Sequence, residues 1–143
     1  MHSKSIGDIG EAKVLAKFLE LGYDVYLPFG ENTRIDMIVD INGELYKIQV
    51  KTCSKIDNGC SKFHLSNGCY RAGHDKAYLY AYNNTQIDYF ALYSMEAEEI
   101  YFIHVDDANS SGIWIRNNKP NKEHTSIRNA EDYLIDNVIE NLP

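Results

Sequence analysis

The sequence RIDMIVDINGELYKIQVK, residues Arg34–Lys51, consists of two runs rich in apolar residues, joined by Asn42-Gly43. Asn-Gly between two such runs is the strongest short-range signal for a β-hairpin with a two-residue turn. We therefore predict two paired strands, over residues 34–41 and 44–52, and place the residues next to the turn opposite each other. In that register, the numbers of two facing residues always total 85.

This register places Asp36 opposite Gln49 and Arg34 opposite Lys51, provided that no bulge interrupts the strands. Directly opposed residues on one sheet face have Cβ atoms about 4.5–5.5 Å apart. Because side chains alternate between the faces of a strand, Asp36, Gln49 and Lys51 share one face. The other face is apolar and is predicted to be core. Its residues are Ile35, Met37, Val39, Tyr46, Ile48 and Val50.

A second carboxylate is expected to reach this polar group from the first helix. We predict that this helix begins at Ser5, as its N-cap, and ends at Gly22, with Phe18 on its apolar stripe. Glu11 falls on the same stripe, and an inward-facing carboxylate is costly unless it has a partner. A divalent cation held by Glu11 and Asp36 would be such a partner.

The remaining chain predicts further strands and a terminal helix. The expected strands are residues 24–28, a short one near Phe63, 77–82, 87–93, 101–105 and 113–116. We place a turn at 83–85 between the third and fourth of these, and one helical turn at Met95–Glu99. The terminal helix is expected from Ser126, with one apolar face formed by Ile127, Ala130, Leu134, Val138 and Leu142. The order helix, strands, helix predicts one α/β (α+β) domain over residues 1–143, with a mixed sheet.

The net charge of −7 and the pI near 5.1 exclude a protein that grips nucleic acid through bulk positive charge. They do not exclude a local basic surface, because binding depends on where the charges lie. Residues 47–76 contain six basic side chains against two acidic ones. We therefore predict contacts with double-stranded DNA from these and nearby basic residues: Arg34, Lys47, Lys55, Lys62, Arg71, Lys76, Arg116, Lys119 and Lys122.

No stretch approaches the roughly 20 apolar residues of a membrane span, so we expect no membrane partner. The polar N-terminal residues predict an intracellular, cytoplasmic protein. Three cysteines without a CxxC pair favour reduced thiols. Five potential zinc ligands lie close together in the sequence, but their spacing matches no usual zinc module, so we favour buried thiols and exposed imidazoles. They are Cys53, Cys60, His64, Cys69 and His74.

Three short segments together resemble the PD-(D/E)XK nuclease superfamily. They are Gly7-Asp8-Ile9-Gly10-Glu11, Arg34-Ile35-Asp36 and Gln49-Val50-Lys51. Within the superfamily, the group I intron-encoded homing endonucleases of this type are the most similar, and archaeal Holliday-junction resolvases and small restriction enzymes are more distant. The resemblance covers about the first 52 residues, is weaker at Asp88-Tyr89-Phe90, and is slight in the last third.

The resemblance implies a restriction-endonuclease-like core and a metal-dependent DNA endonuclease. Asp36 would be the central metal ligand, and Glu11 would bind the metal directly or through water. Gln49 would occupy the second acidic position, and Val50 would add a further metal ligand. Lys51 would activate the attacking water or stabilise the pentavalent phosphate. The implied cofactor is Mg²⁺ or Mn²⁺, which prefer oxygen ligands.

Two departures from the family pattern bear on function. Ile35 replaces the proline, which carries no chemistry, and Gln49 replaces an acidic residue, which removes a charge from the metal site. Several interpretations stay open: a homing endonuclease, a Holliday-junction resolvase or restriction-type nuclease, and a non-catalytic DNA-binding module on a degenerate nuclease fold. Because one site cuts one strand, double-strand cleavage predicts a homodimer or homotetramer.

Overall fold

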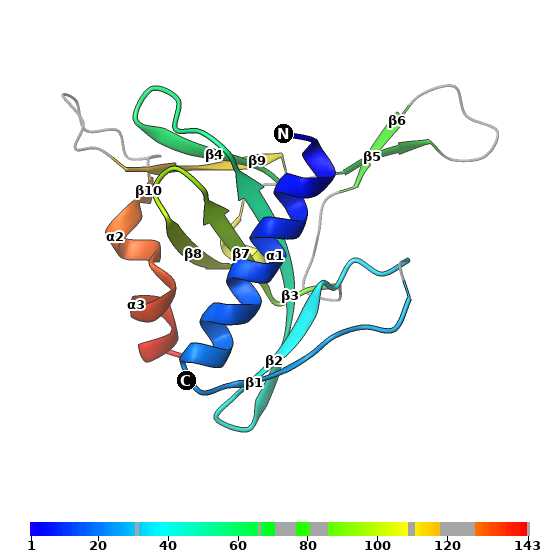
Figure 1. Ribbon diagram of the computed structural model, residues 1–143, viewed down its shortest axis with the longest axis vertical. Helices are drawn as coiled ribbons and strands as arrows, with labels where there is room; N and C mark the ends of the chain where they lie inside the picture. The colour runs from blue at the N-terminus through cyan, green and yellow to red at the C-terminus, as the bar shows by residue number, and fades with distance from the viewer. Residues whose placement is uncertain are drawn as a thin grey trace.

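The computed structural model describes residues 1–30, 32–65, 67–70, 77–80, 86–108, 111–117 and 128–142. A long helix, α1 (Ser3–Glu20), lies across a five-stranded sheet (Figure 1). In spatial order the strands are β1 (Asp24–Tyr26), β2 (Met37–Ile41), β3 (Glu44–Cys53), β7 (Tyr89–Ser94) and β8 (Glu99–His104).

The sheet is mixed, which confirms the predicted fold class. Strands β1, β2 and β3 are antiparallel neighbours, β3 pairs in parallel with β7, and β7 pairs antiparallel with β8. All six residues of β7 are buried, as expected for a strand covered on both faces. The strands expected at 77–82 and 87–93, on either side of a turn, do not pair with each other. Strand β6 (Ala77–Tyr80) pairs instead with β5 (Asn67–Tyr70), and the intervening turn at 83–85 lies outside the described residues.

The hairpin register predicted from Asn42-Gly43 is confirmed over the whole of β2. The pairs run from Ile41 opposite Glu44 to Met37 opposite Ile48. Asn42 and Gly43 have φ values of 54° and 90°, the positive values that a type I′ turn requires. Beyond Met37, however, the register does not continue.

At Asp36 the register shifts by one residue, because Asp36 and Met37 both lie opposite Ile48. The backbone amide of Asp36 donates to the carbonyl of Ile48 at 2.8 Å, whereas the predicted register would pair it with Gln49. The facing pairs predicted for Asp36 and for Arg34 are therefore not ladder pairs. Ile35 likewise packs against the second core cluster, on the side of the sheet away from α1, and not against the first as predicted.

Helix α1 begins and ends where local geometry dictates. His2, and not Ser5, is the N-cap, because its Nδ1 accepts a hydrogen bond from the amide of Lys4 at 3.3 Å. The helix gives way at Leu21 to Gly22, whose φ of +88° confirms the predicted stop.

The buried stripe of α1 comprises Gly10, Val14 and Phe18. These residues and the neighbouring strands form the first core cluster, which α3 (Ile135–Glu140) completes through Ile135 and Ile139. Helices α1 and α3 thus cover the same face of the sheet (Figure 1).

A second, three-stranded sheet covers the other face at β7 and β8. Its strands are β4 (Cys60–His64), β9 (Gly112–Arg116) and β10 (Arg128–Asn129). Phe63, Ile113 and Ile115 of this sheet join Phe90 and Tyr101 in the second core cluster. A short 3-10 helix, η1 (Val105–Asp107), follows β8.

The prediction of one continuous terminal helix from Ser126 is wrong. Strand β10 precedes a four-residue helix, α2 (Ala130–Tyr133), and the chain then breaks at Leu134 before α3. Leu134 is extended, with ψ at 132°, because it forms a β-bridge with Tyr101 at the edge of the sheet. Residues 95–98 form a non-helical turn between β7 and β8, so the predicted helical turn there is also wrong.

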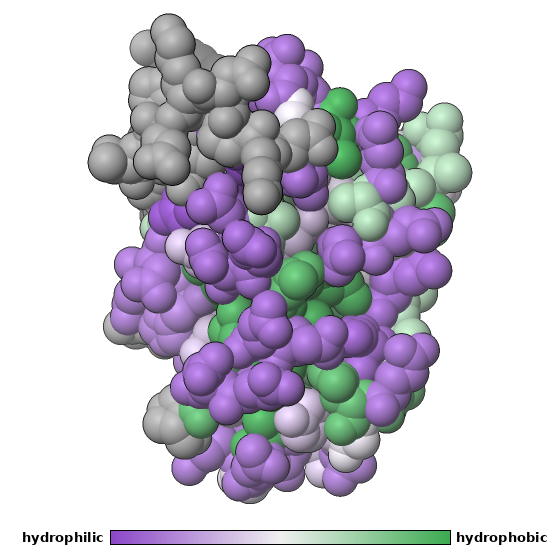
Figure 2. Space-filling view, turned by 90° about the vertical axis from the view of Figure 1, so that its left-hand side faces the viewer, coloured by the Kyte–Doolittle hydropathy of each residue, from purple (hydrophilic) through white to green (hydrophobic). Residues whose placement is uncertain are grey.

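The surface is largely polar on the side that bears α2 and α3. Figure 2 shows hydrophilic side chains over most of this face, with apolar patches between them. Within the described ranges, we find no helix of the length and apolarity that crossing a membrane requires.

The closest approach of α1 to the sheet generates a prediction about stability. A Cβ atom added at Gly10 would lie 1.8 Å from Oγ1 and 3.1 Å from Cβ of Thr52 on β3. We expect Gly10→Ala to lower the free energy of unfolding by about 1–3 kcal/mol, because the helix must move away from β3. Denaturant unfolding measures this loss.

Gly7→Ala is the matched control, because nothing lies within 4 Å of a Cβ at that position. Adding Thr52→Ala should restore part of the stability of Gly10→Ala by removing the clashing hydroxyl. Equal stability of the Gly10→Ala and Gly7→Ala variants would contradict the close approach.

Candidate active site

Asp36 is held against β3 by two hydrogen bonds. Its amide donates to the carbonyl of Ile48, and its Oδ2 accepts from the amide of Val50 at 2.7 Å. The side chain thus takes the role of a backbone carbonyl at the point where the β2–β3 ladder ends. The chain therefore forms a local bulge at Asp36. The bulge fixes the carboxylate directly before β2 and beside β3.

Glu11 reaches Asp36 because α1 approaches β3 so closely one residue earlier, at Gly10. The two carboxyl groups share a side-chain hydrogen bond. Glu11 as a residue is exposed and borders the buried stripe, so the prediction of an inward-facing position is wrong, although the predicted meeting with Asp36 is confirmed.

Gly10 makes this meeting possible, although it is not among the site residues predicted from the sequence. A signal for it was present, because Gly10, Val14 and Phe18 are spaced by four residues along the helix. A glycine on the buried stripe of a helix indicates that a neighbouring element comes too close for a side chain.

Both carboxyl groups have raised pKa values, for which burial is the largest cause. The pKa of Glu11 is raised to about 7, first by burial and then by the charge of Asp36, the hydrogen bond between them and the charge of Asp8. Burial also raises the pKa of Asp36, although the hydrogen bonds from Val50 and Glu11 and the charge of Lys51 act in the opposite direction. Without a cation, the pair therefore retains a proton near neutral pH.

Lys51 lies on β3 close to the carboxylates. Its pKa is lowered by burial, raised by the charge of Asp36 and lowered by the charge of Arg34. These influences show that Asp36, Lys51 and Arg34 are electrostatic neighbours, as the hairpin reasoning predicted. The ammonium group of Lys51 therefore lies near Asp36, and the guanidinium group of Arg34 lies near Lys51.

Gln49 shares a sheet face with Lys51, because the two residues are two apart on β3. Its Oε1 is buried and has no hydrogen-bond partner among the described residues. A buried acceptor without a partner costs about 1–3 kcal/mol, and a cation beside it would remove that cost.

These groups fit a hard divalent cation. Two carboxylates and one amide oxygen are the ligands that Mg²⁺ prefers, and both carboxyl pKa values are raised as if a positive charge were needed. Among the described residues, no group of three His, Cys, Asp or Glu side chains is placed to hold a metal. The backbone amide of Val50 donates a hydrogen bond to Asp36. Metal binding by the backbone carbonyl of Val50 stays a prediction.

Two of the basic residues predicted to contact DNA lie on the same part of the structure as Lys51. Arg34 neighbours Lys51, and Lys47 is on β3, four residues before it and on the same sheet face. Lys55 is exposed in the segment after β3.

The other predicted DNA contacts lie elsewhere or outside the described residues. Lys62, on β4, forms an ion pair with Asp57 at 2.8 Å and lies 4.3 Å from the ring centre of Trp114. Arg116 ends β9. The residues outside the described ranges are Arg71, Lys76, Lys119 and Lys122.

Cys53 and Cys60 are buried free thiols and His64 is exposed, as favoured over a zinc site. The side chains of Cys69 and His74 lie outside the described residues.

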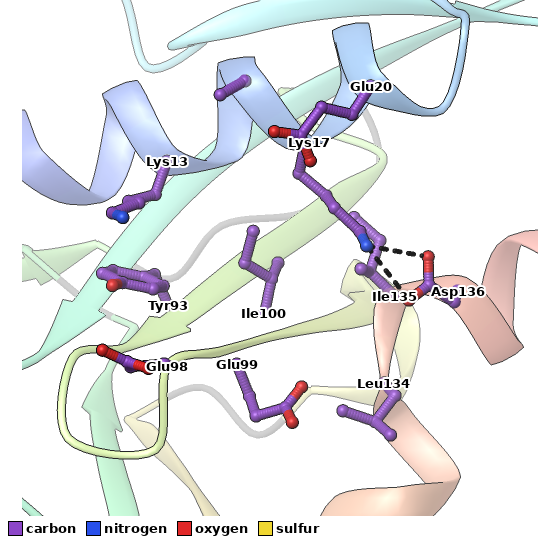
Figure 3. Close-up of a pocket in the computed structure, with 11 residues that line it drawn as sticks. Lys13, Lys17, Glu20, Tyr93, Glu98, Glu99, Ile100, Leu134, Ile135 and Asp136 are labelled. Atoms are coloured by element: carbon purple, nitrogen blue, oxygen red, sulfur yellow. Dashed lines mark hydrogen bonds and ion pairs between the residues drawn. The ribbon is translucent and has the colours of Figure 1, made fainter.

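A hollow of about 420 Å³ lies on the opposite side of α1, between that helix, the β7–β8 turn and α3 (Figure 3). The ion pair of Lys17 with Asp136, at 3.0 Å, crosses it. None of Glu11, Asp36 and Lys51 lines this hollow, so it is separate from the carboxylate pair.

The mixed sheet with flanking helices defines the restriction-endonuclease-like class of fold. A family model described as PD-(D/E)XK endonuclease matches residues 1–136, and the chain therefore belongs to this family of nucleases. Among solved structures, the chain is similar to a bacterial homing endonuclease, I-Ssp6803I, with a TM-score of 0.73 and 24% identity over 94% of this chain and 89% of that one. No curated protein sequence matched.

The proton held by the carboxylate pair generates a prediction about pH and stability. The folded protein keeps the Glu11 proton up to about pH 7, whereas the unfolded chain releases it near 4.5. This contribution to the free energy of unfolding is therefore complete below about pH 4.5 and is lost as the pH rises through 7. Since the carboxyl group is partly solvated, we expect a loss of only about 1 kcal/mol.

In EDTA, Glu11→Gln should therefore become more stable relative to the wild type as the pH rises from about 5 to about 8, by a few degrees in Tm. Thermal unfolding at several pH values measures this difference. Glu20→Gln, on the same helix, is the control and should show no such trend. A Glu11→Gln variant whose relative stability is constant with pH would show that Glu11 and Asp36 do not interact.

Proposed function

We propose that this protein is a metal-dependent endonuclease that hydrolyses phosphodiester bonds of double-stranded DNA, and that it acts as a sequence-specific homing endonuclease. The observation that carries the proposal is the contact of Glu11 with Asp36 beside Lys51. The family match supports nuclease activity. The homing role is supported by the similarity to a structure described as a bacterial homing endonuclease.

In this proposal, Glu11, Asp36 and the amide oxygen of Gln49 hold Mg²⁺ or Mn²⁺, with the carbonyl of Val50 as a further ligand. The bound ion would lower the pKa of a water molecule and neutralise charge on the phosphate. The proton shared by the carboxyl groups must leave before both can bind the ion, so binding should strengthen as the pH rises through about 7.

Lys51 has the position and the charge to assist hydrolysis. Its ammonium group lies near Asp36 and would stabilise the negative charge that builds on the phosphate in the transition state. Its lowered pKa makes loss of a proton easier than for an exposed lysine, which suits a group that accepts a proton from water. Arg34, beside Lys51, would hold the phosphate.

One structural feature favours a second candidate function, a DNA-binding module without catalysis. Gln49 supplies an uncharged ligand at a position where the family pattern has an acid, which weakens metal binding. The choice between a homing endonuclease and a resolvase or restriction-type enzyme depends on the substrate. We also propose an intracellular, reducing location, which suits the buried free thiols of Cys53 and Cys60.

The proposed oligomer follows from the number of sites. One carboxylate pair per chain cuts one strand, and a double-strand break therefore needs at least two chains. A homodimer or homotetramer would also bring two identical surfaces to DNA.

Cleavage of a diverse DNA library in Mg²⁺, with mapping of the cut sites, tests the proposal. We expect cuts at defined sequences, abolished by EDTA and lowered by at least about a hundredfold in a variant combining Asp36→Ala and Lys51→Ala. Four-way junctions in the same assay distinguish a resolvase.

Lys13→Ala is the matched control, because Lys13 lies on the far side of α1 at the hollow of Figure 3. It should cut like the wild type. The proposal is abandoned if the double variant cuts as fast as the wild type, and tight DNA binding without nicking in Mg²⁺ or Mn²⁺ supports the binding module.

The uncharged side chain of Gln49 generates a separate prediction about metal binding. Gln49→Glu adds a negative charge to the metal site, and affinity for such cations rises with the charge of the ligands. We expect the Mg²⁺ concentration for half-maximal cleavage to fall by about tenfold, whereas Gln49→Ala should raise it. Metal titration of the cleavage rate measures both, and an unchanged metal requirement in both variants would remove Gln49 from the site.

A further inference from the structure

Exposed apolar side chains of the described residues gather at the end of β1 and in the loop that follows it, and a further one lies at the beginning of β3, next to the Asn42-Gly43 turn. Of the seven large exposed apolar residues in the described part of the chain, four lie on β1, in the loop that follows it, or at the beginning of β3. They are Tyr26 at 54% exposure, Leu27 at 64%, Phe29 at 108% and Leu45 at 61%. Single exposed apolar residues are normal on a protein surface, but such a cluster indicates contact with something.

Phe29 is the most exposed of the four. It is followed by Gly30, whose φ of +95° allows the chain to turn back toward β2. The loop between β1 and β2 extends well beyond both strands, as Figure 1 shows on the right-hand side. A fully exposed aromatic ring at such a place buries no apolar surface in the folded chain, so it is free to contact another molecule.

The loop returns directly into the active site. Residues 34 and 36, at its end, supply the guanidinium group beside Lys51 and the central carboxylate. The seven residues from Phe29 to Asp36 span at most about 24 Å when extended. Since neighbouring base pairs are about 3.4 Å apart, the ring lies within about seven base pairs of a phosphate bound at Asp36.

The chemistry of the loop suits a DNA duplex. Leu27, Pro28 and Phe29 are uncharged and do not repel phosphates. The loop sequence up to Arg34 contains one acid, Glu31, and one base, Arg34 itself, so its net charge is zero, and Arg34 at its end attracts phosphates. Apolar side chains such as Phe, Leu and Pro can enter a groove and wedge between base steps, which unstacks and kinks the duplex.

We propose that Leu27, Pro28 and Phe29 form an apolar wedge that inserts into the DNA duplex within about seven base pairs of the cut phosphate. This inference rests on the proposed function, because it takes DNA as the molecule bound at Asp36. Unstacking at the wedge favours steps that kink easily, so the loop contributes to the choice of cleavage site.

The test uses duplexes of the mapped cleavage site with 2-aminopurine placed in turn at each position near the cut. In a Lys51→Ala background with Mg²⁺, we expect fluorescence to rise at one step within about seven base pairs of the cut and to stay low at the others. The signal should disappear with Phe29→Ala and return with Phe29→Trp. In the otherwise wild-type enzyme, Phe29→Ala should lower kcat/KM by about tenfold or more.

Leu19→Ala is the matched control, since Leu19 is 55% exposed on α1 and lies outside this cluster. It should change neither fluorescence nor cleavage, and Phe29→Ala should melt at the wild-type temperature. Normal cleavage and fluorescence with Phe29→Ala would overturn the wedge alone, whereas a wild-type protein that cuts no DNA would overturn the proposed function first. A change of oligomeric state in DNA-free Phe29→Ala, seen by sedimentation, would make the cluster a contact between copies of this chain and also overturn the wedge.

Discussion

The approach of α1 to β3 is the contact on which the site depends. Residue 10 has no side chain, so the helix backbone can lie against Thr52 where a Cβ atom would be 1.8 Å from its hydroxyl oxygen. The next residue along the helix, Glu11, is thereby brought to Asp36. The same packing buries Val14 and Phe18 against the sheet, so the apolar contacts that stabilise the fold also set the position of the carboxylate.

The polar side chains at the site do not fully satisfy one another's hydrogen-bonding and charge requirements. Two carboxyl groups with raised pKa values share a hydrogen bond, and the buried amide oxygen of Gln49 has no partner within the described residues. A buried polar group without a partner lowers the stability of a fold. Natural proteins retain such groups at functional sites, where a ligand can supply the missing partner. These groups contrast with the well-paired backbone of β3 and β7, and a cation at this point of the sheet is the ligand that we propose for them.

Much of the arrangement was predictable from local sequence. The type I′ turn at Asn42-Gly43 sets the register of β2 and β3, and that register held from the turn to Met37. It failed at Asp36, because a side-chain oxygen there replaced a backbone acceptor, a choice that hydrophobic alternation does not report. The partners of β6 and β7 were not predictable from the intervening turn, since pairing across the sheet depends on which strand can be buried on both faces. The break at Leu134 has the same origin, because its extended backbone pairs with Tyr101 on a distant strand.

The sequence by itself determined the mixed α/β class, the hairpin register, the end of the first helix at Gly22 and the identities of the acidic and basic groups of the site. These features depend on interactions between residues close in the chain, whose geometry a few side chains dictate. The tertiary structure decided that Glu11 lies at the border of the helix stripe and touches Asp36, and that Gln49 is left without a partner. It also decided that the apolar loop of Phe29 ends at the site. These features depend on how closely distant elements pack, which is set by the shape of the whole core and by no local pattern.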